Sequence, residues 1–303
     1  MRNRPNWSLG EIRRASGFAR LPRLGYGFGM NSTDLRIKPL TPVLGAEIEG
    51  IDLERRSDED LRAISNALTQ HQVIFFRDQD ISVEAQMALG THFGELVAHP
   101  NDPGLEGHPE VMIIHADESS KRVAGESWHT DVSCETEPPM GSILRIHTLP
   151  ATGGDTLFAS MYAAYEALSE PMKAFLGGLY AVHDGAPYYR SVNQRIGRDD
   201  GGRSYPRAVH PVVRTHRISG RKALFVNEMF TTHVEGLSAA ESRAVLGMLF
   251  EHVKQPRFQC RFRWQKNSIA FWDNRCVQHQ AIWDYWPETR SGYRVTIKGD
   301  KPE

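Results

Sequence analysis

The chain has 303 residues, long enough for one large β domain or two small ones with a substantial core. Its 36 lysines and arginines nearly balance its 37 aspartates and glutamates, so no strong net charge is available to recruit nucleic acid or an anionic membrane. The longest strongly apolar stretches, such as residues 73–76, are far shorter than the roughly 20 residues of a membrane span. We therefore expect neither a nucleic-acid nor a membrane partner.

Three cysteines, Cys134, Cys260 and Cys276, occur without a CxxC pair and without a recognisable secretory segment before them. This usage is typical of a reduced compartment and argues against a disulfide framework. We expect a cytoplasmic protein in which Cys134 and Cys276 are buried apolar residues.

Residues 1–30 carry six arginines against a single acid, Glu11. A transit peptide has such a bias, but a flexible basic tail or a translated leader before Met30 explains it better, because recognisable patterning begins only after that residue. We expect a disordered extension over residues 1–30 and a single domain over residues 31–303.

The first predicted elements alternate strands with helices. Residues 44–53 alternate apolar and polar side chains around two glycines, as strands with a bulge or turn do. Ser57 can cap a helix with apolar residues at helical spacing, and residues 73–76 predict a strand. Ser82 can cap a second helix through about Phe93.

The middle of the chain predicts strands over residues 111–114 and 142–148, because β-branched residues are frequent there. Two short helices follow, over residues 160–168 and 169–179. Residues 184–207 are rich in Gly, Arg, Asn and Tyr without periodicity, so we expect an irregular segment there that is a candidate lid.

The last third of the chain begins with a capping box at Ser238 and ends in strands over residues 258–264, 269–272 and 293–297. Strands before and after a helical insertion suit a β-sandwich or jelly roll better than a doubly wound sheet. Neither GxGxxG nor GxxxxGK occurs, so a nucleotide-binding function lacks its usual motif. The expected fold class is mostly β with flanking helices.

The stretch Trp128-His129-Thr130-Asp131 predicts a metal site. On a strand, residues two apart share a face, so His129 and Asp131 can bind one ion, with His279 supplied by a distant segment. Two imidazoles and one carboxylate are the ligands of non-haem Fe(II) oxygenases. For the triplet alone, a histidine satisfied by a buried hydrogen bond, or chance, remains the stronger interpretation.

Two arginines, Arg290 and Arg294, follow His279. A buried guanidinium binds a carboxylate through two parallel hydrogen bonds, so two of them beside a metal can hold two anions. For a lone arginine, a solvated surface charge is the alternative interpretation.

With these segments the chain resembles the taurine dioxygenase and 2,4-dichlorophenoxyacetate dioxygenase family, from about residue 40 to residue 302. The motifs that carry the resemblance are LGAEI at 44–48, WHTD at 128–131, TGGDT at 152–156, HPVV at 210–213, LFVNE at 224–228, WDNR at 272–275 and the segment 279–294. Together they are specific to this family, and they change the interpretation of the triplet from chance to metal site.

The resemblance implies a double-stranded β-helix, which is a jelly-roll, cupin-like fold. It implies Fe(II) bound by His129, Asp131 and His279 as the catalytic centre, and 2-oxoglutarate as cosubstrate with its far carboxylate at Thr156 and Arg290. Molecular oxygen is the oxidant, with succinate and carbon dioxide as coproducts. The family also implies a homo-oligomer, either a dimer or a tetramer.

For the substrate, the resemblance places Arg294 opposite a sulfonate, with His99 as a second anion contact, and Val132, Tyr189 and Phe230 along the pocket wall. A structural ion pair for Arg294, a loop cap for His99 and ordinary core positions for the other three are the alternatives.

Two positions depart from taurine dioxygenase. Asp102 stands where that enzyme has a tyrosine, and Gly125 where it has an asparagine. Gly125 removes an amide and is expected to open space, whereas Asp102 can pair with an ammonium or repel an anion. The expected substrate is a small organic anion, such as a sulfonate, an alkyl sulfate or an aryloxyalkanoate, larger than taurine or different in charge.

Two other functions stay open. The same cofactor chemistry can act on a natural-product or amino-acid-derived substrate, and a jelly-roll protein can instead be a metal or ligand sensor without turnover.

Overall fold

The largest sheet has seven strands in the order β1-β2-β3-β13-β5-β15-β4 in the computed structural model, which describes residues 35–303. The expected extension over residues 1–30 lies outside these residues. The strands are β1 (Arg36–Pro39), β2 (Ala46–Glu49), β3 (Val73–Phe76), β13 (Ser268–Asp273), β5 (Gly141–Thr148), β15 (Arg290–Ile297) and β4 (Val111–Ala116). β2 and β3 pair in parallel, and the other neighbours are antiparallel.

Three smaller sheets complete the strands of the described chain. One has the order β12-β6-β14, with β12 (Gln259–Phe262), β6 (Thr156–Ser160) and β14 (Val277–Ala281). A second has the order β11-β7-β8, with β11 (Thr231–Val234), β7 (Tyr180–Asp184) and β8 (Arg207–Pro211). The third pairs β9 (Val213–Thr215) with β10 (Lys222–Leu224).

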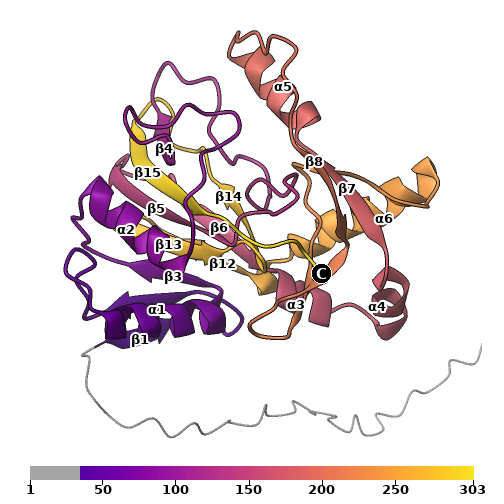
Figure 1. Cartoon of the computed structure of the whole chain (residues 1–303), viewed down its shortest axis with the longest axis horizontal. Coiled ribbons are helices and arrows are strands. Elements are labelled where there is room, and N and C mark those ends of the chain that lie inside the picture. The colour runs from indigo at the N-terminus through magenta and orange to yellow at the C-terminus, as the bar shows by residue number, and fades with distance from the viewer. Residues whose placement is uncertain (1–34) are drawn as a thin grey trace, which may run out of the picture. The chain divides into compact units, whose positions relative to one another are not determined.

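The inner strands β3, β13 and β5 of the seven-stranded sheet are buried on both faces, and alternation along them divides their side chains between two cores. In β3, Val73 and Phe75 belong to the core shared with β6 and β12, whereas Ile74 and Phe76 belong to the core under the helices. Figure 1 shows the two helices of that second core, α1 (Asp58–His71) and α2 (Val83–Phe93), against this sheet. The observed fold is therefore a mixed, β-rich one with helices on one sheet face.

Every helix predicted from a serine begins at that serine. The hydroxyls of Ser57, Ser82, Ser160, Ser169 and Ser238 each accept a hydrogen bond from the backbone N–H three residues on. The resulting helices include α3 (Met161–Glu166), α4 (Glu170–Leu176) and α6 (Ala239–Val253). α3 and α4 end earlier than predicted, and a 3₁₀ turn, η1 (Pro256–Phe258), follows α6.

The expectation of an irregular segment over residues 184–207 is wrong in its first half. An α-helix, α5 (Ala186–Arg195), lies there, with a proline in its first turn. It buries Tyr189, Val192 and Asn193 on one side. Their spacing of three and four residues is helical, but the polar composition of the segment obscures this periodicity in the sequence.

The predicted strand through the metal triplet is also wrong. His129 forms a single antiparallel bridge with His279, and a turn begins at Asp131, where Val132 has a positive φ of 42°. The turn, rather than strand alternation, directs the aspartate. β14, which carries His279, and β6, which carries Thr156, were not predicted.

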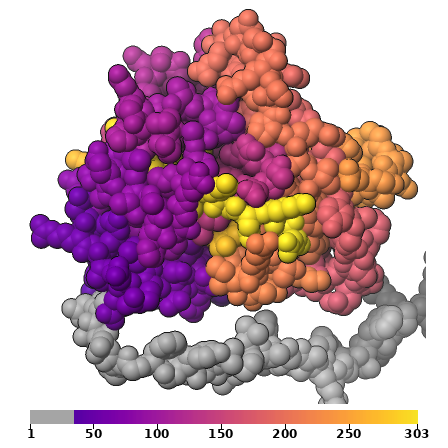
Figure 2. Space-filling view, viewed as in Figure 1, coloured from indigo at the N-terminus to yellow at the C-terminus, as the bar shows by residue number. Residues whose placement is uncertain are grey.

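The C-terminal segment connects distant parts of the chain. Figure 2 shows its yellow atoms between the indigo-to-magenta and the orange segments, and backbone hydrogen bonds join Lys298 to Glu95 and Thr215 to Glu303. Among the helices of residues 35–303, none has the length and apolar character required to cross a bilayer.

A buried charge cluster ties the end of β13 to the small β9-β10 sheet. The Asp273 carboxylate, 1% exposed, accepts two hydrogen bonds from the Arg275 guanidinium at 2.8 and 2.7 Å and contacts His216 Nε2 at 3.0 Å. Cys276 lies beside them and would complete a possible metal-ligand set. Because Arg275 already occupies both carboxylate oxygens, we interpret the cluster as a structural ion pair.

We predict that Asp273→Ala lowers the free energy of unfolding by about 3–5 kcal/mol, because it leaves the Arg275 guanidinium buried without a counter-charge. Chemical denaturation followed by circular dichroism measures this. The control is Glu166→Ala, which breaks the exposed Glu166–Arg221 ion pair and is expected to cost at most about 1 kcal/mol. Equal losses in the two variants would contradict the prediction.

Candidate active site

The three predicted metal ligands meet at one buried point. The Nε2 atoms of His129 and His279 lie 3.6 and 3.8 Å from Asp131 Oδ1, and the two imidazole centroids are 4.1 Å apart. All three residues are at most 6% exposed. The structure therefore brings together one donor atom from each residue, with the bridge between His129 and His279 setting the spacing of the two rings.

The hydrogen bonding of His129 presents the correct nitrogen to a metal. Its Nδ1 lies 2.8 Å from the carbonyl oxygen of Ser127, which can only accept, so Nδ1 carries a proton and Nε2 is the nitrogen directed at the site. His279 Nδ1 is buried without a partner in the described structure, while its ring packs on Trp272 at 4.6 Å between centroids. Burial lowers the pKa of His279 well below its usual value, so this imidazole is neutral.

Asp131 is held as a carboxylate by three neighbours. Its Oδ1 accepts from Arg294 Nη1 at 2.8 Å, and its Oδ2 accepts from Ser142 Oγ at 2.8 Å and from Asn274 Nδ2 at 3.2 Å. Burial alone would raise the pKa of Asp131, but the Arg294 guanidinium and the two imidazoles bring it well below its ordinary value. Trp272 Nε1 donates to the other end of the Asn274 amide and fixes its orientation.

The site lies between two sheets. Ser142 is on β5 and Arg294 on β15, both in the seven-stranded sheet, whereas His279 is on β14 of the β12-β6-β14 sheet and His129 bridges to it. One sheet thus positions the carboxylate and the other positions the imidazoles. Their distance apart depends on the packing of the core between the sheets.

A second small pocket is lined by both imidazoles and by Arg290. Thr156 and Arg290 both line it, together with His129 and His279. Arg290 is 4% exposed, its Nε donates to the carbonyl of Gly154 at 3.0 Å, and its Nη2 is buried without an acceptor among the described residues. Burial lowers the pKa of Arg290 to about 10, so it remains positive at neutral pH.

The two glycines of the TGGDT motif are required because other side chains pack closely against their backbone. Both glycines have positive φ, and a Cβ would lie 2.5 Å from an Asp284 carboxylate oxygen at Gly153 and 3.0 Å from Arg290 Cδ at Gly154. The turn therefore lets backbone groups reach Arg290 and carries the chain directly into Thr156. The Thr156 hydroxyl accepts from Trp264 Nε1 at 2.9 Å, so its own proton is free to donate.

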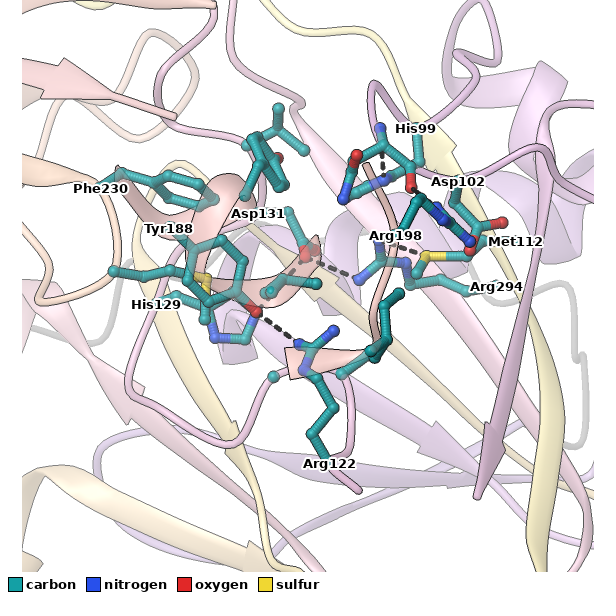
Figure 3. Close-up of a pocket in the computed structure, with 18 residues that line it drawn as sticks. His99, Asp102, Met112, Arg122, His129, Asp131, Tyr188, Arg198, Phe230 and Arg294 are labelled. Carbon is teal, nitrogen blue, oxygen red and sulfur yellow. Dashed lines mark hydrogen bonds and ion pairs between the residues drawn. The ribbon is translucent and has the colours of Figure 1, made fainter. Parts of the chain in front are cut away.

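The main pocket contains every predicted substrate residue. Figure 3 shows the side chains that line this pocket, His129 and Asp131 among them. Its lining includes His99, Asp102, Gly125, Val132, Tyr189, Phe230 and Arg294. Val132, Tyr189 and Phe230 pack with one another in a small apolar cluster, so they are both pocket wall and core.

His99 is a neutral hydrogen-bonding group in the pocket, and Asp102 stabilises its own loop. Burial, followed by the nearby Arg294 charge, lowers the pKa of His99 to about 3, so its imidazole is neutral. Its Nδ1 accepts the backbone N–H of Asn101 at 3.2 Å, which leaves Nε2 as a hydrogen-bond donor. Asp102 Oδ1 accepts the backbone N–H of Gly104 at 3.0 Å and stabilises the loop.

Several residues of the site escaped sequence reasoning. Ser142 and Asn274 hold Asp131, and Arg122, Tyr188 and Arg198 line the main pocket. The WDNR motif at 272–275 marked Asn274 without indicating its partner, and α5, which carries Tyr188, had not been predicted. Arg122 stands seven residues before His129 with no spacing signal of its own.

Gly125 does not open the space expected of it. Its φ is +79°, and a Cβ there would lie 2.9 Å from Cε1 of the His129 imidazole, so the ring occupies that volume. The Gly125 carbonyl accepts the backbone N–H of Ala281 at 2.8 Å, which fixes the loop against β14. Glycine at position 125 therefore allows the His129 ring, a predicted metal ligand, to pack directly against the backbone.

We predict that Gly125→Ala weakens Mn(II) or Fe(II) binding about 10–100-fold, because the new methyl group displaces the His129 ring. Titration of the purified protein with metal measures this. Gly107→Ala is the matched control, because Gly107 has a φ of +80° but open space at its Cβ. Both variants carry a backbone strain of about 1–2 kcal/mol, and only the first should lose metal affinity.

Comparison with known proteins places the chain in a family. The model of the family described as taurine catabolism dioxygenase TauD, TfdA matches residues 36–296. An alpha-ketoglutarate-dependent sulfate ester dioxygenase of Pseudomonas putida is 36% identical over 283 residues, which cover 90% of this chain and 92% of that protein. A taurine dioxygenase structure from Burkholderia xenovorans has a TM-score of 0.77 at 36% identity, covering 88% of this chain and 92% of that one.

A further solved structure, of AAD-2 in complex with Mn(II) and N-oxalylglycine, has a TM-score of 0.74 at 28% identity, covering 88% of this chain and 98% of that one. Its fold thus accommodates a divalent metal and an oxalyl compound. The family match over most of the chain and the two relatives at 36% identity lead to one conclusion. The chain belongs to the taurine catabolism dioxygenase TauD, TfdA family.

Proposed function

We propose that the protein is an Fe(II)- and 2-oxoglutarate-dependent dioxygenase that hydroxylates a small organic anion. The observation that carries this proposal is the meeting of the His129, Asp131 and His279 donors beside Arg290, a buried guanidinium with an orphaned Nη2. A sensor has to bind only a metal or a ligand. It would not need both a three-residue metal site with free coordination positions and a separate buried arginine for a second ligand.

The donor set fits Fe(II). Two imidazole nitrogens and one carboxylate oxygen occupy one side of a possible ion and leave positions free for other ligands. The low pKa of His279 favours a neutral imidazole and the low pKa of Asp131 favours a carboxylate, which are the forms that bind a metal, and the Ser127 carbonyl leaves His129 Nε2 directed at the site. When bound, iron with oxygen and 2-oxoglutarate supplies the oxidation of a substrate C–H bond, with succinate and carbon dioxide as coproducts.

The pocket lined by Arg290 fits the cosubstrate. His129 and His279 line it together with Thr156 and Arg290, whose buried Nη2 has no acceptor among the described residues. We assign to Thr156 and Arg290 the far carboxylate of 2-oxoglutarate, because a guanidinium and a hydroxyl in one pocket orient a dicarboxylate. Trp264, which donates to Thr156 and packs under Arg290, holds both side chains in place.

The substrate anion is assigned to Arg294, with His99 as a neutral hydrogen-bond donor beside it. Arg294 Nη1 donates to Asp131, but its Nε is buried without an acceptor among the described residues. The same side chain can therefore orient the carboxylate and bind an anion. Val132, Tyr189 and Phe230 would exclude water from the bound carbon chain.

Sheet order and resemblance support the finer features of the fold. The seven-stranded sheet and the β12-β6-β14 sheet, with a site between them, suit a double-stranded β-helix. We propose one dioxygenase domain over residues 31–303. The family resemblance also supports a homo-oligomer, either a dimer or a tetramer, and the cysteine usage supports a cytoplasmic location.

We predict Fe(II)-dependent formation of succinate when a sulfonate, an alkyl sulfate or an aryloxyalkanoate is added with 2-oxoglutarate and oxygen. Hydroxylation of the carbon that bears sulfonate or sulfate gives a product that fragments to an aldehyde and sulfite or sulfate. Succinate and sulfur oxyanions are measured by chromatography. Succinate that stays at the substrate-free rate with every compound would show that the substrate class is wrong.

We predict that Arg290→Ala weakens 2-oxoglutarate binding by about 2–5 kcal/mol, because it removes the buried charge that faces the far carboxylate. Anaerobic addition of 2-oxoglutarate to the Fe(II) protein, followed by its visible charge-transfer band, measures the dissociation constant. Arg243→Ala, on the exposed side of α6, is the control and should leave the titration unchanged. If the wild-type protein develops no band, the cofactor assignment itself fails.

A further inference from the structure

The main pocket contains a second arginine that the proposed reaction does not use. Arg122 lies in the loop before His129, and Figure 3 shows its guanidinium directed into the pocket toward the Tyr188 hydroxyl. Arg122 Nη2 donates to that hydroxyl at 2.9 Å. Its Nε is buried and has no acceptor within the described part of the chain.

The charge of Arg122 is not balanced by a protein carboxylate. No acid among residues 35–303 lies within 4.0 Å of its nitrogens, and Glu126, in the same loop, is paired with Arg195 at 2.8 Å. Burial raises the pKa of Tyr188, so the phenol that Arg122 contacts is neutral. Arg294 differs, because it pairs with Asp131.

Two positive charges therefore act on one pocket. The fields of Arg122 and Arg294 both reach Tyr188 and His99, which lie on different sides of the pocket. A half-buried guanidinium without a counter-ion is costly, and a pocket that keeps one is prepared for an anion. A guanidinium with a free edge also suits a carboxylate or sulfonate better than a neutral group.

We propose that Arg122 is a specificity-determining residue that binds a second anionic group of the substrate. This inference rests on the proposed function and narrows its substrate class. The substrate is then an organic acid with two anionic groups, one at Arg294 beside the metal and the other at Arg122 across the pocket. The hydroxylated carbon lies near the first group.

Arg198 does not serve equally well as the second anion contact. It is exposed, and its guanidinium donates to the backbone carbonyl of Asn101 at 3.5 Å, in the loop that also carries Asp102. The alternative role for Arg122 is a latch that holds α5 over the pocket through Tyr188. The test separates the two roles.

The test compares ω-sulfocarboxylates of increasing chain length with their ω-sulfocarboxamides, which are matched in size but carry one anionic group. Calorimetry on the Mn(II)-loaded protein with 2-oxoglutarate gives both dissociation constants, and turnover of the Fe(II) enzyme gives kcat and KM. At one chain length, the wild type should prefer the carboxylate at least about tenfold. Arg122→Gln should abolish most of this preference and act on KM more than on kcat.

Two further variants make the outcome decisive. Arg190→Gln removes an exposed arginine of α5 that pairs with Asp200 and does not line the pocket, and it should keep the preference. Tyr188→Phe removes the phenol but keeps the Arg122 charge, and it should also keep the preference.

Three results would overturn the inference. They are a wild type that ignores the second charge at every chain length, an Arg122→Gln variant that weakens both ligands equally, and a Tyr188→Phe variant that loses the preference. Absence of succinate with every sulfonate would instead refute the proposed function, while the calorimetric preference would still decide the role of Arg122.

Discussion

The site depends on one constraint, which is the position of the Asp131 carboxylate between two sheets. Ser142, Asn274 and Arg294 hold it from the side of the seven-stranded sheet, while the imidazoles of His129 and His279 face it from the other side. A buried carboxylate is stable only when its oxygens are paired, and here each oxygen has a donor before any metal binds. The donor triad is consequently preorganised, and the cost of gathering it is met by folding.

Three arginines of the site, Arg122, Arg290 and Arg294, are suited to different anions because their surroundings differ. Arg290 is buried, donates to Gly154 and lies beside Trp264, and its Nη2 has no acceptor among the described residues. Arg294 is tied to Asp131 and thereby couples the substrate pocket to the metal centre. Arg122 has no carboxylate beside it among residues 35–303, and it lines the pocket next to Tyr188. Three similar side chains thus offer three different sites because burial and existing partners differ.

Glycines and turns bring these groups close enough to act together. The Gly153-Gly154 turn lets Arg290 and Asp284 approach the backbone, and Gly125 lets the His129 ring stand against its own loop. The turn after His129 puts Asp131 opposite both imidazoles, although no strand runs through it. In each case the absence of a side chain, or a left-handed backbone, determines where a functional group can lie.

The sequence by itself determined the local elements and the chemical types of the site. Serine caps and hydrophobic spacing located the helices at Ser57, Ser82 and Ser238, and the motifs around His129, Asp131, His279 and Arg290 indicated a metal and an anionic cosubstrate. These features depend on neighbours within a few residues or on motifs that recur as units. The tertiary structure alone decided the bridge between His129 and His279, the helix α5 over the pocket, and the partners of Asp131 and Arg122. The bridge joins segments more than a hundred residues apart, and the other contacts involve loops whose course is set by packing, so no local pattern encodes them.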